Sequence, residues 1–358
     1  MTATEYERKL KRTGNNMDAI RYVLAFAVVV EHFNYLCGAD IPFPVSASTG
    51  VGGFFALSGF LIYRNFEKRP GLRHYIAARA RRILPPYLFI VLLCAFLLAA
   101  VSSLPAAGYF TDPQWWRYIV ANALFLNFIE PSLPGVFEGS QFATAAVNGS
   151  LWTMKVEWCL YLSVPLVAAI LRRLHRSPRD SAGIFCAIIA LSTGYSWLFD
   201  YMHRLSGQEI YAILGRQVFG QLSFFYTGVL LYYRLDTLLR RKWTILVLLI
   251  CGLAAIRLWP ETGIFLRPPV LGTLVIWFSM VGNWGHLISR HDNVSYDIYL
   301  FHFPLIQLAV MAGITRLGQW TGLLAVTAAV TALAFLSWNL VGRRFMRPAP
   351  RPAPPQTT

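Results

Sequence analysis

An acid and a base interrupt an apolar stretch near the start of the chain. Glu31 and His32 lie in VLAFAVVVEHFNYL, residues 23–36, which otherwise has the composition of a membrane-spanning helix. Ionisable groups are costly inside a bilayer, and they usually face one another or a water-filled cavity. The pair therefore indicates acid–base chemistry within the membrane. The sequence leaves one alternative open, in which the histidine only bonds a neighbouring helix.

An arginine shares a helix face with this histidine. Arg21 precedes His32 by eleven residues, and eleven steps of about 100° return a helix to within about 20° of its start, with a rise of about 16 Å. We expect Arg21 near the inner end of the helix and His32 nearer the outer end, both bordering one passage through the protein. The alternative for Arg21 is an anchor at the inner lipid headgroups.

A second acid lies in another apolar segment. Glu157 is a turn and a half into SLWTMKVEWCLYLSVPL, residues 150–166, and Tyr161 follows one turn later. Because this segment is expected to enter from the outside, Glu157 should lie at about the depth of His32. An acid and a base at one depth, on two different helices, predict a shared site.

Three further residues are candidates for contacts with a substrate. Ser58 lies in GVGGFFALSGFLI, whose glycines permit close helix packing, and a bond to a neighbouring helix is the alternative role for it. His302 lies in SYDIYLFHFPL, where a packed histidine bonded to backbone is the alternative. Trp152 is expected at the membrane interface, where tryptophan is common.

Composition indicates an integral membrane protein. Of 358 residues, 56% are hydrophobic and 14% are charged, whereas soluble proteins carry about 25% charged residues. The net charge of +15 would suggest nucleic acid as a partner in a soluble protein, but these basic residues gather in alternate loops, so we expect no nucleic-acid partner. The five cysteines include no CxxC pair, and we expect them to be packing residues without a metal site.

Apolar runs of spanning length recur along the whole chain and predict an all-α bundle of about ten transmembrane helices. The runs cover residues 19–38, 49–65, 85–103, 151–171, 182–199, 214–233, 243–259, 265–284, 294–313 and 319–341. The loops expected inside are strongly basic, while those expected outside mix both signs. By the positive-inside rule, both termini lie in the cytoplasm.

Four segments fall outside the simple spans. Residues 66–84 predict a basic amphipathic helix at the inner surface, and residues 115–129 an interfacial or re-entrant segment that caps the outer face. Residues 1–16 form a basic cytoplasmic tail, and residues 345–358 are a proline-rich tail expected to be disordered.

The motifs, taken in order, resemble those of the membrane-bound acyltransferase 3 family, which includes bacterial O-antigen, exopolysaccharide and Nod-factor O-acetyltransferases. The matching features are Arg-x10-His, GVGGFFALSGFLI, RARRILPPY, SLWTMKVEWCLYLSVPL and SYDIYLFHFPL. The resemblance runs over residues 17–344, which we take as the membrane acyltransferase domain. Glu31 and Lys155 depart from the residue types that are common in the family at those positions.

The resemblance implies transfer of an acyl group, usually acetyl, from acyl-CoA to a hydroxyl of a carbohydrate or glycolipid, in a multi-pass protein of the bacterial inner membrane. Acetyl-CoA would be a co-substrate, and no permanently bound cofactor is implied. The family's essential arginine and histidine map onto Arg21 and His32, its basic segment onto Arg79 and Arg82, and its acid onto Glu157.

A mechanism follows from these roles as a hypothesis. His32 would act as general base on the acceptor hydroxyl, and Glu157 would orient the imidazolium or bind sugar hydroxyls. Arg21, Arg79 and Arg82 would hold the phosphates of CoA. Glu31, Ser58, Trp152, Tyr161 and His302 are the further candidates for substrate contacts. A covalent acyl-histidine intermediate remains an alternative.

Two other classes of function compete with this interpretation. A transporter or flippase of a lipid-linked sugar would also need buried ionisable residues, but it should show internal repeats, and the sequence shows none. A non-catalytic assembly or sensor protein would not need an acid and a base at one depth. The acceptor, the acyl chain and the oligomeric state cannot be predicted from the sequence.

Overall fold

The protein is built from helices. The computed structural model describes residues 16–68, 71–138, 146–285, 287–288 and 292–346, and no strand occurs among them. Ten helices in this part have at least 16 residues, and each overlaps one predicted apolar run. They are α2 (Met17–Cys37), α3 (Ala47–Lys68), α4 (Leu72–Leu97), α7 (Trp152–Arg173), α8 (Ala182–Ser206), α10 (Val218–Tyr233), α12 (Lys242–Leu258), α13 (Gly263–Met280), α14 (Ser295–Met311) and α15 (Gln319–Ser337). The expected all-α class is confirmed.

Several of these helices are suited to a bilayer by length and composition. Six segments of the described chain are long and apolar enough to cross it, and they contain α2, α4, α7, α8, α13 and α15. Helices α10, α12 and α14 have 16, 17 and 17 residues, fewer than the roughly 20 residues of a typical span. Helix α3 has 22 residues, but its glycines and hydroxyl residues make it less apolar. The protein is therefore a multi-pass membrane protein, and the number of ten spans stays a prediction.

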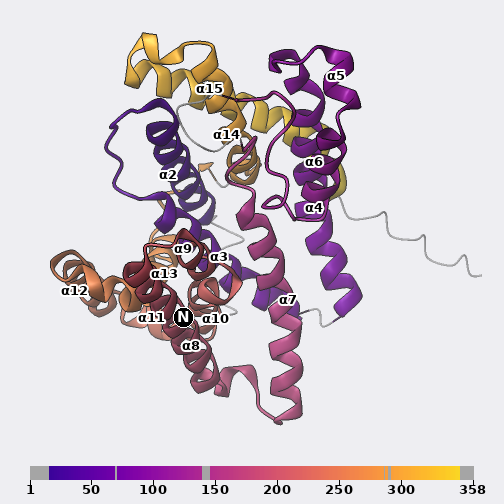
Figure 1. The fold of residues 1–358 in the computed structure, drawn as a ribbon. Coiled ribbons are helices and arrows are strands. Elements are labelled where there is room, and N and C mark those ends of the chain that lie inside the picture. Colours follow the sequence, from indigo (N-terminus) through magenta and orange to yellow (C-terminus); the bar gives the residue numbers. More distant parts are fainter. Residues whose placement is uncertain (1–15, 69–70, 139–145, 286, 289–291, 347–358) are drawn as a thin grey trace, which may run out of the picture.

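Helix α3 lies at the centre of the contacts. It packs against α2, α7, α10 and α13, while α14 packs between α2 and α15. Figure 1 shows α4 with the short helices α5 (Ala106–Thr111) and α6 (Pro113–Ala123) on one side of α7, and α8 to α13 on the other side. The short helices α9 (Glu209–Gly215) and α11 (Leu235–Arg240) belong to the second group.

Small residues bring α3 very close to its neighbours. A Cβ atom added to Gly59 would lie 1.9 Å from the carbonyl oxygen of Phe225, and one added to Gly228 would lie 1.9 Å from that of Ala56. The backbones of α3 and α10 are thus in direct contact. A Cβ on Gly50 would lie 2.9 Å from the carbonyl oxygen of Leu24 in α2. The close packing predicted from the glycines of α3 is confirmed.

The basic segment is not a separate helix. Residues 66–84 were expected to form an amphipathic helix at the inner surface, but residues 72–84 are the first half of α4, which runs on to Leu97. Pro85 and Pro86 lie inside this helix. A proline inside a helix removes one backbone donor and its ring crowds the preceding turn, yet α4 continues through both prolines and carries its arginines into the protein.

The segment between α4 and α7 packs onto α4. Helix α6 begins at Pro113, where the Asp112 side chain accepts a hydrogen bond from the backbone N–H of Gln114. The indole of Trp115 and the hydroxyl of Tyr109 both donate to the carbonyl oxygen of Ala95. Most of the two predicted tails lies outside the described residues, although Asn16 is buried against the end of α13.

Candidate active site

Three arginines surround a cavity of about 280 Å³. This arginine cavity is lined by the inward-facing side chains of Arg21 from α2, Arg79 and Arg82 from α4, and Glu157 from α7. One carboxyl group and three guanidinium groups thus line one space. Since guanidinium groups bind phosphates well, the cavity is suited to an anionic ligand. Ser58 and Tyr161 also line it.

A second cavity, of about 540 Å³, contains the histidine of α2. This histidine cavity is lined by His32, Glu31 and Trp152, and by polar residues from the ends of α8, α10 and α13. Arg21 does not line it, so Arg21 and His32 face two different cavities rather than the single passage that was expected. Val51 and Tyr299 line both cavities, so these two side chains lie between the two spaces.

His32 is paired with a second histidine. Its Nδ1 lies 2.7 Å from Nε2 of His302 in α14, and the two rings stack with centroids 5.0 Å apart. His302 has 0% exposure and lines neither cavity. The role of His302 as a substrate contact is therefore not supported, and the packed, backbone-bonded alternative describes its position better, since its Nδ1 lies 2.7 Å from the carbonyl oxygen of Tyr299.

Glu157 is not brought to His32. Its carboxylate accepts a hydrogen bond from the hydroxyl of Tyr161, one turn further along α7. The Tyr161 hydroxyl also lies 3.5 Å from Oγ of Ser58. This short chain of hydrogen bonds faces the arginine cavity, so Glu157, Tyr161 and Ser58 form one polar group in its wall. The expected sharing of one site by Glu157 and His32 is not seen.

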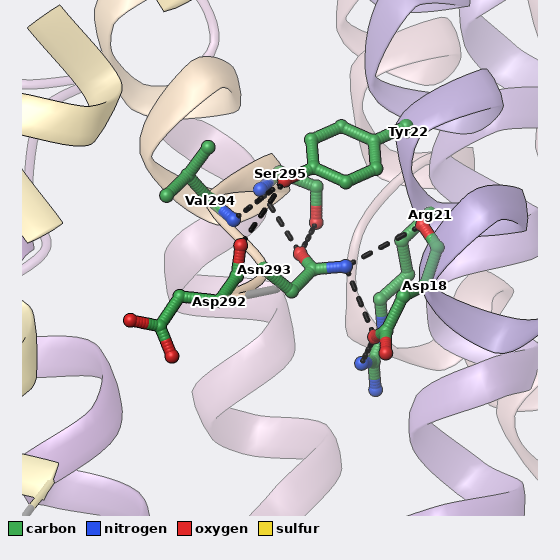
Figure 2. Close-up of polar contacts among 7 residues, drawn as sticks. All are labelled: Asp18, Arg21, Tyr22, Asp292, Asn293, Val294 and Ser295. Carbon is green, nitrogen blue, oxygen red and sulfur yellow. Dashed lines mark hydrogen bonds and ion pairs between the residues drawn. The ribbon is translucent and has the colours of Figure 1, made fainter. Parts of the chain in front are cut away.

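A polar network holds Arg21 in place (Figure 2). Its guanidinium pairs with Asp18 at 3.0 Å, and the Nδ2 atom of Asn293 donates to the same carboxylate oxygen at 3.0 Å. The Oδ1 atom of Asn293 in turn accepts from the backbone N–H of Ser295 at the start of α14. The network joins α2 to the loop before α14, and it fixes where the arginine points.

Two arginines of α4, Arg79 and Arg82, line the arginine cavity side by side. Arg79 and Arg82 are three residues apart and so lie on one face of the helix. The Nε atom of Arg79 is buried without a hydrogen-bond partner in the described part of the chain, and its guanidinium lies 6.0 Å above the ring of Tyr161. A buried donor without a partner is costly, and a bound anion would satisfy it.

Two other candidates have structural contacts. The Oε2 atom of Glu31 accepts a hydrogen bond of 2.6 Å from the backbone N–H of Ala47, the first residue of α3. The ring of Trp152 lies 5.9 Å below the guanidinium of Arg216, at the histidine cavity. Lys155 instead lies over the ring of Phe128.

Sequence reasoning missed three residues of the site. Asp18 and Asn293 orient Arg21, and Tyr299 separates the cavities. The spacing of Asp18 and Arg21, three residues apart on one helix, is a signal for an ion pair. Asn293 and Tyr299 had no such signal, because their roles depend on how α14 packs against α2 and α7.

Comparison with known proteins assigns the chain to a family. A family model described as an acyltransferase domain matches residues 15–339. The chain belongs to the acyltransferase 3 family. Two of the relatives are named as O-acetyltransferases, and the protein is a membrane O-acyltransferase. The alternatives of a transporter and of a non-catalytic sensor are set aside.

Relatives match over most of this acyltransferase. It is 25% identical to an O-acetyl transferase of Shigella phage Sf6 over 93% of this chain and 96% of the relative. It is 24% identical to nodulation protein 10 of Rhizobium leguminosarum bv. viciae, over 93% of each chain. It is also 24% identical to the peptidoglycan O-acetyltransferase OatA of Listeria monocytogenes, over 94% of this chain and 56% of the relative. No solved structure gives a significant match.

Proposed function

We propose that the protein transfers an acetyl group from acetyl-CoA to a hydroxyl group of a carbohydrate, with His32 as general base. The observation that carries the proposal is the presence of two neighbouring cavities that share Val51 and Tyr299 in their walls, one lined by three arginines and the other by an imidazole. The names of the relatives support O-acetyl transfer. The donor, the base and the acceptor class are our own assignment.

The arginine cavity is suited to the donor. Arg21, Arg79 and Arg82 would bind the phosphates of CoA, and the buried Nε of Arg79 would gain the partner that the described residues do not supply. A cavity of about 280 Å³ is too small for the whole of CoA. The nucleotide would therefore lie at its mouth, while the thin pantetheine arm leads the thioester towards Val51 and Tyr299.

The histidine cavity is suited to the acceptor. His32 faces it from α2, and Trp152 offers an aromatic surface with the guanidinium of Arg216 above it. In the reaction, His32 takes the proton of the acceptor hydroxyl as that oxygen attacks the thioester carbonyl. The carbon–sulfur bond then breaks, and the proton passes from His32 to the sulfur of CoA. A base placed in this way raises the reaction rate by about 10²–10⁴-fold.

The placement in the cell follows from the charge pattern. The ends of α3 and α4 that lie near the arginine cavity carry the basic segment of residues 64–84. The positive-inside rule puts such a segment in the cytoplasm, where acetyl-CoA is made. We therefore place the arginine cavity on the cytoplasmic side and the histidine cavity towards the outer face of a bacterial inner membrane.

The test is an assay of transfer. Membranes holding the protein are incubated with radiolabelled acetyl-CoA, and label is counted in the polysaccharide fraction. We expect His32→Ala to abolish incorporation while the amount of folded protein stays the same. The matched control is His74→Ala, because His74 is exposed on α4 and lines neither cavity. A His32→Ala protein with normal incorporation would rule out the proposed base.

A further inference from the structure

A buried histidine next to His32 has no role in the reaction as described so far. His302 has 0% exposure and lies between His32 and the backbone of its own helix. The ring of Phe303 packs edge-on against both imidazoles. In the described chain no carboxylate is bonded to either ring. We propose, resting on the function proposed above, that His302 is a positioning residue that fixes the tautomer of His32.

The hydrogen bonds determine which nitrogen carries each proton. A carbonyl oxygen only accepts, so the Nδ1 of His302, at 2.7 Å from the carbonyl oxygen of Tyr299, must carry a proton. In a neutral imidazole the other nitrogen, Nε2, then has a lone pair. The Nδ1 of His32, at 2.7 Å from this Nε2, must donate to it. His32 consequently keeps its proton on Nδ1, and its Nε2 is unprotonated.

This arrangement prepares His32 to act as a base. No hydrogen-bond partner of its Nε2 is found among the described residues, and the ring lines the histidine cavity. The lone pair is therefore available to an acceptor hydroxyl. Both rings stay neutral before the reaction, which avoids the cost of a buried charge.

The histidine pair also stabilises His32 after it has taken the proton. When the hydroxyl proton moves to Nε2 of His32, the ring becomes an imidazolium, and its Nδ1–H donates a charge-assisted hydrogen bond to Nε2 of His302. In serine proteases a buried aspartate holds the histidine in its working tautomer and stabilises the imidazolium. Here a second imidazole, held by the carbonyl of Tyr299, takes the place of that carboxylate.

Two variants separate positioning from packing. His302→Phe keeps a ring of similar shape in the apolar site but removes the acceptor for His32. His302→Gln keeps a side-chain oxygen that reaches about as far as Nε2 and accepts the same hydrogen bond. We expect the kcat of His302→Phe to fall by about 10²–10⁴-fold, with the KM for acetyl-CoA unchanged, and His302→Gln to restore most of the loss.

A readout independent of activity uses nitrogen NMR. The protein is labelled with ¹⁵N-histidine and measured in lipid, with the signals of His32 identified by their loss in His32→Ala. We expect a protonated Nδ1 and an unprotonated Nε2 for His32 in the wild type. In His302→Phe, His32 should change to the Nε2-protonated form that free histidine prefers.

The outcomes are distinct. A His302→Phe protein with normal kcat, or with a raised KM alone, would overturn the positioning role, as would an Nε2-protonated His32 in the wild type. If the wild type transfers no acetyl group to carbohydrate, the proposed function fails. The NMR signals of His32 would still decide the tautomer in that case.

Discussion

Two adjacent residues of α2 have different tasks. His32 faces the histidine cavity and stacks on His302, whereas the carboxylate of Glu31 bonds to the first backbone N–H of α3. The first N–H groups of a helix have no partner within it, and a negative charge is favourable at that end of the helix dipole. The acid that precedes His32 therefore anchors the start of α3.

Loss of this cap should lower stability. Glu31→Ala removes the acceptor for the N–H of Ala47, and we expect the free energy of unfolding to fall by about 0.5–2 kcal/mol. Glu31→Gln keeps an oxygen that accepts the bond and loses only the charge, which is worth about 0.3–1 kcal/mol. Thermal unfolding in detergent measures both variants. An unchanged melting temperature in Glu31→Ala would show that the bond contributes nothing.

At the scale of single helices, α4 presents its arginines selectively. Arg79 and Arg82 line the arginine cavity, whereas Arg81 is exposed and does not. We expect Arg79→Gln and Arg82→Gln each to weaken CoA binding by about tenfold or more, since a hydrogen bond to a charged group contributes about 1.5–3 kcal/mol. Arg81→Gln is the matched control and should bind normally. Calorimetric titration measures the affinity of all three variants for CoA. An equal loss of affinity in all three would contradict the prediction and point to a general effect of charge.

The crossing of α3 and α10 should not tolerate a side chain. A Cβ on Gly228 would meet the backbone of Ala56, and backbone cannot move aside as a flexible side chain can. We expect Gly228→Ala to lower the free energy of unfolding by about 1–3 kcal/mol, the usual range for overpacking. The control is Gly194→Ala on α8, where the new Cβ has no atom within 4 Å. We expect its free energy of unfolding to rise by up to about 1 kcal/mol, because alanine favours the helix more than glycine does. Melting temperatures compare the two, and a stable Gly228→Ala would contradict the close crossing.

At the scale of the whole molecule, apolar runs and glycine spacing predicted the helices and the closeness of α3 to its neighbours. They did not predict which faces meet. Helical spacing put Arg21 and His32 on one side of α2, yet the two residues line different cavities because Val51 and Tyr299 lie between those spaces. Equal depth likewise suggested Glu157 as the partner of His32. The partner is His302, since α14 packs directly against α2.

The boundary between the cavities leads to a last prediction. Reacting atoms must come within about 3–3.5 Å of each other, and a misplacement of about 1 Å can cost about 10²-fold in rate. In the reaction that we propose, the thioester therefore passes Val51 to reach a hydroxyl at His32. Val51→Phe fills this boundary, and we expect acetyl transfer to fall by about 10²-fold while CoA still binds in the arginine cavity.

The control at the same position is Val51→Ala, which widens the boundary and should keep transfer. Binding is measured by titration with CoA, and transfer by the radiolabel assay, on the same preparations. Because the arginines and His32 lie on opposite sides of Val51 and Tyr299, Val51→Phe should reduce transfer without weakening CoA binding, whereas substitutions of the arginines should weaken the binding itself. Normal transfer in Val51→Phe would mean that the acyl group takes another path through the helices.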